Sequence, residues 1–224
     1  MTSFRICPSI LNADQSRLPE EIARIASDAE LLHLDIMDDI FVPNRTFDFA
    51  QSKTIIEESP IPVDVHLMIV DPDHLAAAYA QAGAASVTFH FEATTDPSGV
   101  IASIRSAGAR VGMAIKPKTD LDTVAEFIAN IDMLLIMTVE PGFGGQSFMS
   151  EMMPKVKRAR TIIDLLPSPR PWLQVDGGIS LTTIEVAASA GADTFVAGSA
   201  LFKAEDPAEA IREMKNLLNH GRLA

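Results

Sequence analysis

Short apolar runs rich in β-branched residues alternate with segments of helical periodicity along the whole chain. The runs are RICPSI (5–10), LLHLDI (31–36), VDVHLM (63–68), SVTFHF (86–91), RVGMAI (110–115), MLLIMT (133–138), WLQVD (172–176) and TFVAG (194–198). We expect each run to form a β-strand, because its length and composition are those of a buried strand. The spacing between successive runs leaves room for a crossover helix, as a parallel strand–helix–strand unit requires.

Two of the intervening segments carry clear helix signals. We expect helices over 71–83 and over 119–130, and Gly83 is a good stop for the first of them. Eight strands, each followed by a helix, predict a (β/α)8 TIM barrel that takes up residues 1–224 as one domain. An open doubly wound sheet uses the same units. It usually carries G-x-G-x-x-G after its first strand, however, and that motif does not occur here.

Polar side chains occupy strand positions that in a barrel interior are normally valine, isoleucine or leucine. His33 and Asp35 lie two residues apart and therefore point to the same side of their strand. Asp64 and His66 do the same on the next strand, and Asp176 ends the seventh. Burying such groups costs on the order of several kcal/mol unless a partner or a metal compensates. We predict a cluster of two imidazoles and two carboxylates: His33, Asp35, His66 and Asp176. This set suits Zn²⁺, Fe²⁺ or Mn²⁺ and leaves room for substrate oxygens.

Further polar and sulfur-containing residues near these strands allow two interpretations each. His90 and Glu92, at the end of the fourth strand, either support the cluster or make structural hydrogen bonds. Met37, Met68 and Met137 either fill the core or form a flexible apolar cover beside the cluster.

A turn that contains glycine follows each of the last three predicted strands. The turns are TVEPGFGGQSF (138–148), DGGIS (176–180) and VAGSALF (196–202). Glycine lets backbone N–H groups approach and converge on an anion. Phosphate sites of such barrels commonly lie near the loops after strands seven and eight. The three turns together therefore predict a phosphate site made mainly of backbone.

Composition and charge narrow the class of partner. The formal net charge of −12 argues against nucleic acid and anionic membranes as partners. Hydrophobic residues make up 47% of the sequence, yet its longest apolar runs are too short for a membrane span of about 20 residues. A single cysteine excludes a disulfide framework, and the first residues lack the features of a signal peptide. We therefore expect a cytoplasmic protein.

Seven motifs closely resemble those of the ribulose-phosphate 3-epimerase family, in the same order and over nearly the whole chain. They are CPSILNAD, HLDIMD, FVPN, DVHLM, EPGFGGQSF, QVDGGI and VAGSALF. The resemblance implies a ribulose-phosphate-binding barrel that interconverts D-ribulose 5-phosphate and D-xylulose 5-phosphate through a 2,3-enediolate. It also implies one divalent metal ion per subunit. Zinc is the first expectation for that ion, with Fe(II), manganese and cobalt as alternatives.

The same resemblance implies roles for individual residues. Asp35 and Asp176 would be the acid–base pair and would bind the metal together with His33 and His66. The substrate contacts would be Ser9, His66, Gly142, Phe143, Gly144, Gly145, Asp176, Gly177, Gly178, Gly198 and Ser199. We expect a small ketose phosphate as the partner and a homo-oligomer as the assembly.

Four positions depart from the family pattern. Asp39 and Asp48 stand where glycine is usual, Arg45 where an apolar residue is usual, and Lys118 where glycine is frequent. None is a predicted ligand or lies in a glycine turn, so we expect the chemistry to be intact. Asp39 and Arg45 lie in the loop after the second strand, so they concern the length of the substrate that the site accepts.

Other functions compete with this interpretation. The nearest is a 3-epimerase of another ketose phosphate, a tetrulose or a hexulose phosphate. A related decarboxylase would require a D-x-K-x-x-D array after a strand, and HLDIMDD contains no lysine. A non-catalytic sugar-phosphate sensor would have lost an acid or a base, whereas both aspartates are present.

Overall fold

All eight apolar runs form strands in the computed structural model, which describes residues 4–220. The strands are β1 (Arg5–Pro8), β2 (Leu32–Met37), β3 (Val63–Met68), β4 (Ser86–His90), β5 (Arg110–Ile115), β6 (Met133–Met137), β7 (Trp172–Asp176) and β8 (Thr194–Ala197). They pair in the order β1-β8-β7-β6-β5-β4-β3-β2, and each pair is parallel. An isolated parallel bridge between Ser9 and His33 brings β1 back to β2. The predicted (β/α)8 barrel is confirmed.

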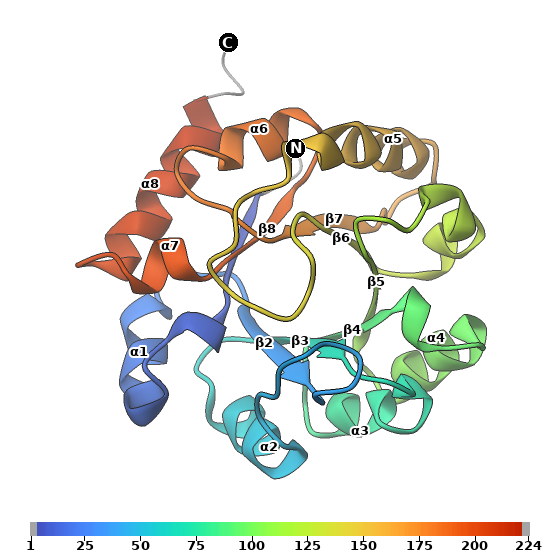
Figure 1. Cartoon of the computed structure of the whole chain (residues 1–224), viewed down its shortest axis with the longest axis horizontal. Coiled ribbons are helices and arrows are strands. Elements are labelled where there is room, and N and C mark those ends of the chain that lie inside the picture. The colour runs from blue at the N-terminus through green and yellow to red at the C-terminus, as the bar shows by residue number, and fades with distance from the viewer. Residues whose placement is uncertain (1–3, 221–224) are drawn as a thin grey trace.

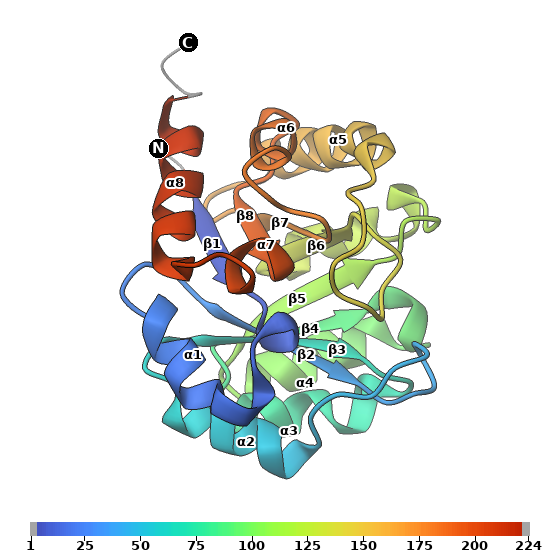
Figure 2. The ribbon, with the colours of Figure 1, turned by 60° about the vertical axis from the view of Figure 1, so that its left-hand side comes forward.

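Helices surround the strands on the outside (Figures 1 and 2). The α-helices are α1 (Leu18–Ile25), α2 (Phe49–Glu58), α3 (Ala76–Gln81), α4 (Pro97–Ser106), α5 (Met153–Asp164), α6 (Ile184–Ser189), α7 (Ser199–Phe202) and α8 (Pro207–His220). Short 3₁₀ helices lie at Ile10–Asn12, Gln15–Arg17, Pro72–His74, Phe91–Ala93, Leu121–Thr123, Ala125–Asn130 and Ser150–Met152. No helix between residues 4 and 220 combines the length and the apolar character needed to cross a bilayer.

Both faces of the strands are buried. On β3, the outward-facing Val65 and Leu67 are completely buried in the layer between strands and helices. The residues between them, Asp64 and His66, face the barrel interior and are also fully buried. Because side chains alternate along β3, its apolar residues pack against the helices and its polar residues point to the barrel axis.

The segment 119–130 does not form the continuous helix that its sequence predicts. It folds as two 3₁₀ helices, Leu121–Thr123 and Ala125–Asn130. Thr123 and Val124 are β-branched, which lowers their preference for an α-helix. A 3₁₀ helix also rises about 2.0 Å per residue, against about 1.5 Å for an α-helix, so this short segment can return to the start of β6.

The segment 71–83 is helical in two parts. A 3₁₀ turn at Pro72–His74 precedes α3, and Gly83 follows it with a φ of +104°. Glycine adopts this left-handed conformation without the steric cost that a β-carbon brings. The predicted stop at Gly83 is therefore confirmed, while the helix before it is shorter than the sequence predicts.

Candidate active site

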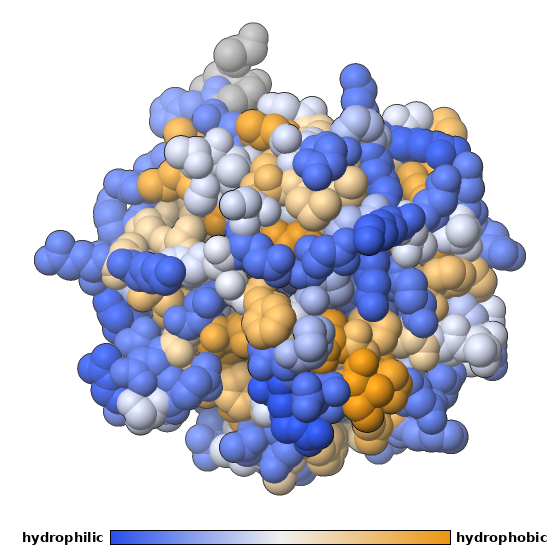
Figure 3. Space-filling model, in the orientation of Figure 1, coloured by the Kyte–Doolittle hydropathy of each residue, from blue (hydrophilic) through white to orange (hydrophobic). Residues whose placement is uncertain are grey.

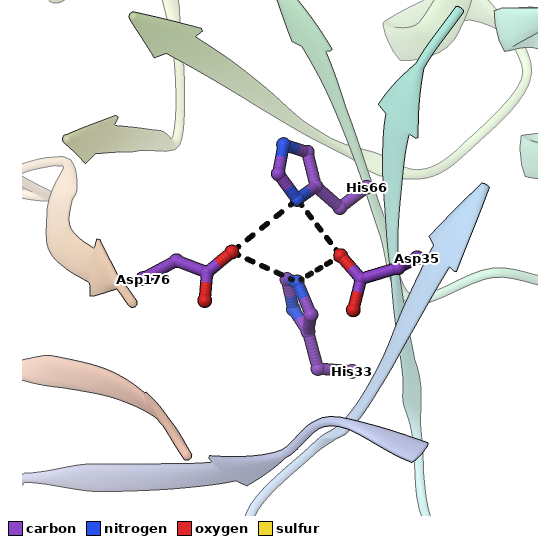
Figure 4. A group of neighbouring side chains, drawn as sticks. All are labelled: His33, Asp35, His66 and Asp176. Carbon is purple, nitrogen blue, oxygen red and sulfur yellow. Dashed lines mark hydrogen bonds and ion pairs between the residues drawn. The ribbon is translucent and has the colours of Figure 1, made fainter. Parts of the chain in front are cut away.

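Four side chains from three strands converge at the carboxyl end of the barrel (Figure 4). One ligand atom from each of His33, Asp35, His66 and Asp176 lies within 4.8 Å of every other. Asp35 and Asp176 face each other across the two imidazoles in Figure 4. Oδ1 of Asp35 lies 3.3 Å from Nε2 of His33 and 3.1 Å from Nδ1 of His66. Oδ2 of Asp176 lies 3.9 Å and 3.6 Å from the same two nitrogens.

These residues fit a divalent metal ion. A tetrahedral ion with bonds of about 2.0 Å separates its ligand atoms by roughly 3.3 Å, close to the distances between these imidazoles and carboxylates. Nε2 of His33 is buried and has no hydrogen-bond partner among the described residues, and it faces the centre of the cluster. A buried ring nitrogen without a hydrogen bond is costly, and a metal ion compensates it. The cluster could therefore bind a divalent metal.

The electrostatics of the cluster favour a cation and distinguish its two aspartates. Burial alone would lower the pKa of His33, but Asp35 and Asp64 outweigh it and raise that pKa well above its ordinary value. Burial would raise the pKa of Asp35, but His33 and His66 hold it well below its usual range. For Asp176, burial and the carboxylate of Asp35 raise the pKa to about 6. Like charges that share a site in this way separate the pKa values of the two carboxyl groups, so Asp176 takes up a proton more readily than Asp35.

Hydrogen bonds behind the cluster hold these side chains in place. The hydroxyl of Ser9 donates to Oδ2 of Asp35 at 2.6 Å, which leaves Oδ1 directed at the imidazoles. Oδ2 of Asp64 lies 2.9 Å from Nδ1 of His33, and the side chain of Gln174 donates to Asp64 at 3.0 Å. Sequence patterns identified Ser9 but assigned no role to Asp64 or Gln174. The polar character of Gln174 on an inward-facing strand position was the available signal.

His90 and Glu92 lie behind His66. Nε2 of His90 is 3.0 Å from Nε2 of His66, and Nδ1 of His90 is 3.2 Å from a carboxylate oxygen of Glu92. Burial lowers the pKa of His90 to about 4, so this ring is neutral at pH 7. His90 contacts the cluster through His66, while Glu92 also makes structural hydrogen bonds to Lys116 and Thr119, so the geometry fits both interpretations open from the sequence.

A cavity of about 50 Å³ lies over the cluster. Its lining includes Ser9, Asp35, Gly142, Phe143, Gly144, Gly145, Asp176, Gly177, Gly178, Gly198 and Ser199, all of them predicted site residues. His33 and His66 are fully buried and do not line it. Met37, Met68 and Met137 do line the cavity, beside the carboxylates. The structure thus places these methionines where an apolar cover would lie.

Close backbone packing explains two of the glycines. A β-carbon on Gly178, whose φ is +68°, would lie 2.4 Å from the backbone nitrogen of Phe148. A β-carbon on Gly177 would lie 2.8 Å from the backbone nitrogen of Val139. The loops after β6 and β7 therefore meet through their backbones, and only glycine permits this approach. The loop after β6, gold in Figure 1, crosses in front of the strands.

Asn12 is a cavity residue that the sequence patterns did not single out. Its side chain is so close to Gly144 and Gly198 that a β-carbon on either glycine would lie within 2.6 Å of it. Asn12 ends the 3₁₀ helix after β1, so only folding brings it to loops that lie more than a hundred residues further along the chain.

Hydrophobic residues appear on the face shown in Figure 3 as separate patches among hydrophilic ones. Phe143, in the loop after β6, is 53% exposed and also lines the cavity. Ile40, in the loop after β2, is 71% exposed. Both side chains belong to loops that follow the carboxyl ends of strands, and Phe143 lies at the edge of the cavity.

The four departures from the family pattern lie outside the cavity lining. Asp39 has a φ of +62°, a conformation that glycine adopts more easily. Asp48 caps α2, since its side chain accepts from the backbone N–H of Gln51. Arg45 donates to the carbonyl of Asp38 at 3.1 Å, and Lys118 is exposed.

The fold and the site together define a (β/α)8-barrel enzyme with a metal-compatible histidine–aspartate cluster at the carboxyl ends of its strands. The chain belongs to the ribulose-phosphate 3 epimerase family, whose model matches residues 5–202. It is 48% identical over 210 residues to the ribulose-phosphate 3-epimerase of Mycobacterium leprae, covering 94% of this chain and 93% of that protein. It is 40% identical over 220 residues to the Schizosaccharomyces pombe ribulose-phosphate 3-epimerase, covering 96% and 94%.

Solved structures with low sequence identity share the fold. The 3-hexulose-6-phosphate synthase from Salmonella typhimurium has a TM-score of 0.71 at 20% identity, covering 97% of this chain and 99% of that one. The KGPDC from Streptococcus mutans in complex with D-R5P has a TM-score of 0.72 at 14% identity, covering 96% and 97%. At these identities the likeness supports the barrel fold alone.

Proposed function

We propose that this chain is a metal-dependent epimerase that interconverts D-ribulose 5-phosphate and D-xylulose 5-phosphate at C3. Membership of the ribulose-phosphate 3 epimerase family supports the reaction class. The observation that carries the assignment of the catalytic residues is the position of Asp35 and Asp176. Their carboxylates face each other across the cluster, one with its pKa below the usual range and the other with its pKa raised to about 6.

The two aspartates divide the proton transfer between them. Asp35, ionised, removes the C3 proton from one face of the sugar, and Asp176, protonated, delivers a proton to the opposite face. The roles exchange in the reverse direction, and the pair titrates as one coupled system. The hydroxyl of Ser9 fixes the Asp35 carboxylate through its 2.6 Å hydrogen bond. The product of proton removal is a 2,3-enediolate, which is re-protonated without leaving the site.

His33, Asp35, His66 and Asp176 would hold the metal ion. A divalent ion there supplies positive charge that stabilises the negative charge developing on the substrate oxygens. Zinc suits two imidazoles and two carboxylates best, with Fe(II), manganese and cobalt as alternatives.

The glycine loops would bind the phosphate, and the small size of their residues supports this role. The segment 142–145 follows β6, Gly177 and Gly178 follow β7, and Gly198 and Ser199 follow β8. Their backbone N–H groups would take the anion without an arginine or lysine cluster. Phe143, half exposed at the entrance, would cover the bound sugar.

We further propose a cytoplasmic homo-oligomer in which the whole chain is one catalytic domain.

The test is a panel of tetrulose, pentulose and hexulose phosphates assayed for C3 inversion after chelation and after reloading with Zn²⁺, Mn²⁺, Fe²⁺ or Co²⁺. We expect chelation to abolish turnover, reloading to restore it, and D-ribulose 5-phosphate to react best. His33→Ala and His66→Ala should lose metal and activity, whereas the exposed His74→Ala should keep both. Full activity in a verified metal-free preparation would rule out the proposed centre, and a better tetrulose or hexulose substrate would reassign the enzyme.

A further inference from the structure

A line of three side chains runs outward from the candidate metal cluster. Nδ1 of His66 faces the two aspartates of the cluster, while Nε2 on the opposite side of its ring lies 3.0 Å from Nε2 of His90. Nδ1 of His90 lies 3.2 Å from Oε2 of Glu92. His66 and His90 are completely buried, and the Glu92 side chain is 20% exposed. The line thus connects the buried cluster to the edge of the barrel.

The chemistry of imidazole fixes the direction of every hydrogen bond in this line. A neutral imidazole carries one proton, and the nitrogen that binds a metal is the unprotonated one. If Nδ1 of His66 binds the ion, its Nε2 carries the proton and donates to Nε2 of His90. That nitrogen of His90 must then be an acceptor, so His90 carries its proton on Nδ1 and donates to Glu92.

Glu92 is itself held firmly. Its second carboxylate oxygen accepts from the backbone N–H of Lys116 at 2.7 Å and from the hydroxyl of Thr119. His90 is held as well, because Phe41 packs against its ring with centroids 5.0 Å apart. The rings of His66 and His90 meet edge to edge through their Nε2 atoms, with centroids 5.1 Å apart and an angle of 27° between their planes. The carboxylate therefore forms a rigid end point for the line.

We propose that His90 and Glu92 are positioning residues that orient His66 with its Nδ1 toward the metal ion. The inference rests on the proposed metal centre and adds two residues to it. Hydrogen-bond partners of metal-bound histidines commonly contribute about 10- to 100-fold to metal affinity. His33 has its carboxylate, Asp64, in direct contact, whereas His66 reaches its carboxylate through a second imidazole.

A purely structural role would give a different result on substitution. Glu92 also fixes the loop after β5 through Lys116 and Thr119, so its loss could act on that loop alone. Thr119→Val removes one hydrogen bond of the loop and leaves the bond between Glu92 and His90 in place. It is therefore the matched control. His90→Gln is the conservative variant, because its amide can accept from His66 and donate to Glu92.

The experiment measures the Zn²⁺ dissociation constant by competition with a chromophoric chelator. His90→Leu should weaken Zn²⁺ binding by about 10- to 100-fold. His90→Gln and Thr119→Val should each stay within about threefold of the parent, a margin of roughly 0.7 kcal/mol. Parental affinity in folded His90→Leu, or an equal loss in His90→Gln, overturns the proposal. A parent that binds no Zn²⁺ instead refutes the metal centre itself.

Nitrogen NMR of the Zn²⁺-loaded parent tests the proton positions directly and needs no variant. We expect His66 to be protonated at Nε2 and His90 at Nδ1. A proton on Nε2 of His90 would overturn the proposed orientation, even if a His90 variant failed to fold.

Discussion

Nδ1 of His33 lies 2.9 Å from Oδ2 of Asp64, a fully buried carboxylate that pairs with His33 across β2 and β3. The hydroxyl of Ser86 donates to Asp64 at 2.6 Å, and the amide of Gln174 donates to it at 3.0 Å. Burial would raise the pKa of Asp64, but these hydrogen bonds and the one from His33 lower it. Asp64 is therefore an ionised acceptor that holds a proton on Nδ1 of His33 and leaves Nε2 free to face the cluster.

Asp64→Asn should weaken metal binding because it removes the charge behind His33 while keeping its shape. We expect a loss of about 10-fold or more in Zn²⁺ affinity, the range measured for comparable hydrogen-bond partners of ligands. Chelator competition measures it. Asp132→Asn is the control, since Asp132 accepts a hydrogen bond from the backbone N–H of Val111 on β5 and pairs with Arg105, away from the cluster. Equal affinities in the two variants would contradict the role of Asp64.

The sequence alone could not assign this role because it does not reveal strand register. Period-two alternation places Asp64 and His66 on the same side of β3, and both were expected to point inward. Only the pairing of β2 with β3 shows that Asp64 lies beside His33 and His66 beside Asp35. That pairing puts Asp64 beside His33 and one inward-facing position before His66 on β3. The convergence of His33, Asp35, His66 and Asp176 was predictable, since all four are polar residues on inward-facing positions near the carboxyl ends of their strands.

Strand bounds were predicted better from the sequence than helix type and long-range contacts. All eight strands lie within two residues of their predicted bounds at each end, because turn signals bound each apolar run. The segment 119–130 has helical periodicity, yet it folds as two 3₁₀ helices. Asn12 reaches the glycine loops only through closure of the barrel. Such long-range contacts leave no local signal in a sequence.

Gly178→Ala should weaken substrate binding through a backbone collision. The new β-carbon would lie 2.4 Å from the nitrogen of Phe148, which forces the loops after β6 and β7 apart. Losing one charge-assisted N–H contact to phosphate costs about 1.5–3 kcal/mol, which corresponds to a rise in KM of roughly 10- to 150-fold. Steady-state kinetics with D-ribulose 5-phosphate, together with metal analysis, measures the effect at full metal occupancy.

Gly108→Ala provides the matched control for this substitution. Gly108 also has a positive φ, +95°, but a β-carbon there would meet nothing within 4 Å. Its substitution adds backbone strain at the amino end of β5 without disturbing the loops. We expect some loss of thermal stability and an unchanged KM. If both variants raised KM equally, general destabilisation rather than the phosphate loops would be responsible.

Asp39 carries a backbone conformation that its side chain disfavours, with a φ of +62°. Asp39→Gly should raise the free energy of unfolding by less than about 1 kcal/mol, because relief of strain is partly offset by the greater freedom of glycine when unfolded. Asp39→Val should lower it by about 1–2 kcal/mol, since a β-branched residue fits this region poorly. Urea denaturation of both variants measures the difference. A stabilising valine would show that the loop is not strained there.

Asp35→Asn and Asp176→Asn separate the two proposed proton-transfer groups. Each variant should lose net epimerisation by about 100-fold or more, the usual contribution of a positioned acid or base. Because each face of C3 has its own base, each variant should still exchange the C3 proton of one epimer with solvent deuterium. The two variants should prefer opposite epimers. Proton NMR in deuterium oxide distinguishes the epimers and follows the exchange.

Metal content decides how these two variants are interpreted, because both aspartates belong to the candidate metal cluster. Asparagine keeps a carbonyl oxygen at nearly the same place, so it preserves a possible ligand better than alanine does. Samples are therefore compared only at equal measured metal occupancy. A metal-loaded variant that epimerises at the parental rate would disprove the two-aspartate mechanism. If both variants exchanged the same epimer, the carboxylate that remains in each variant would not serve its own face of C3. That result would point to one aspartate acting with a water molecule.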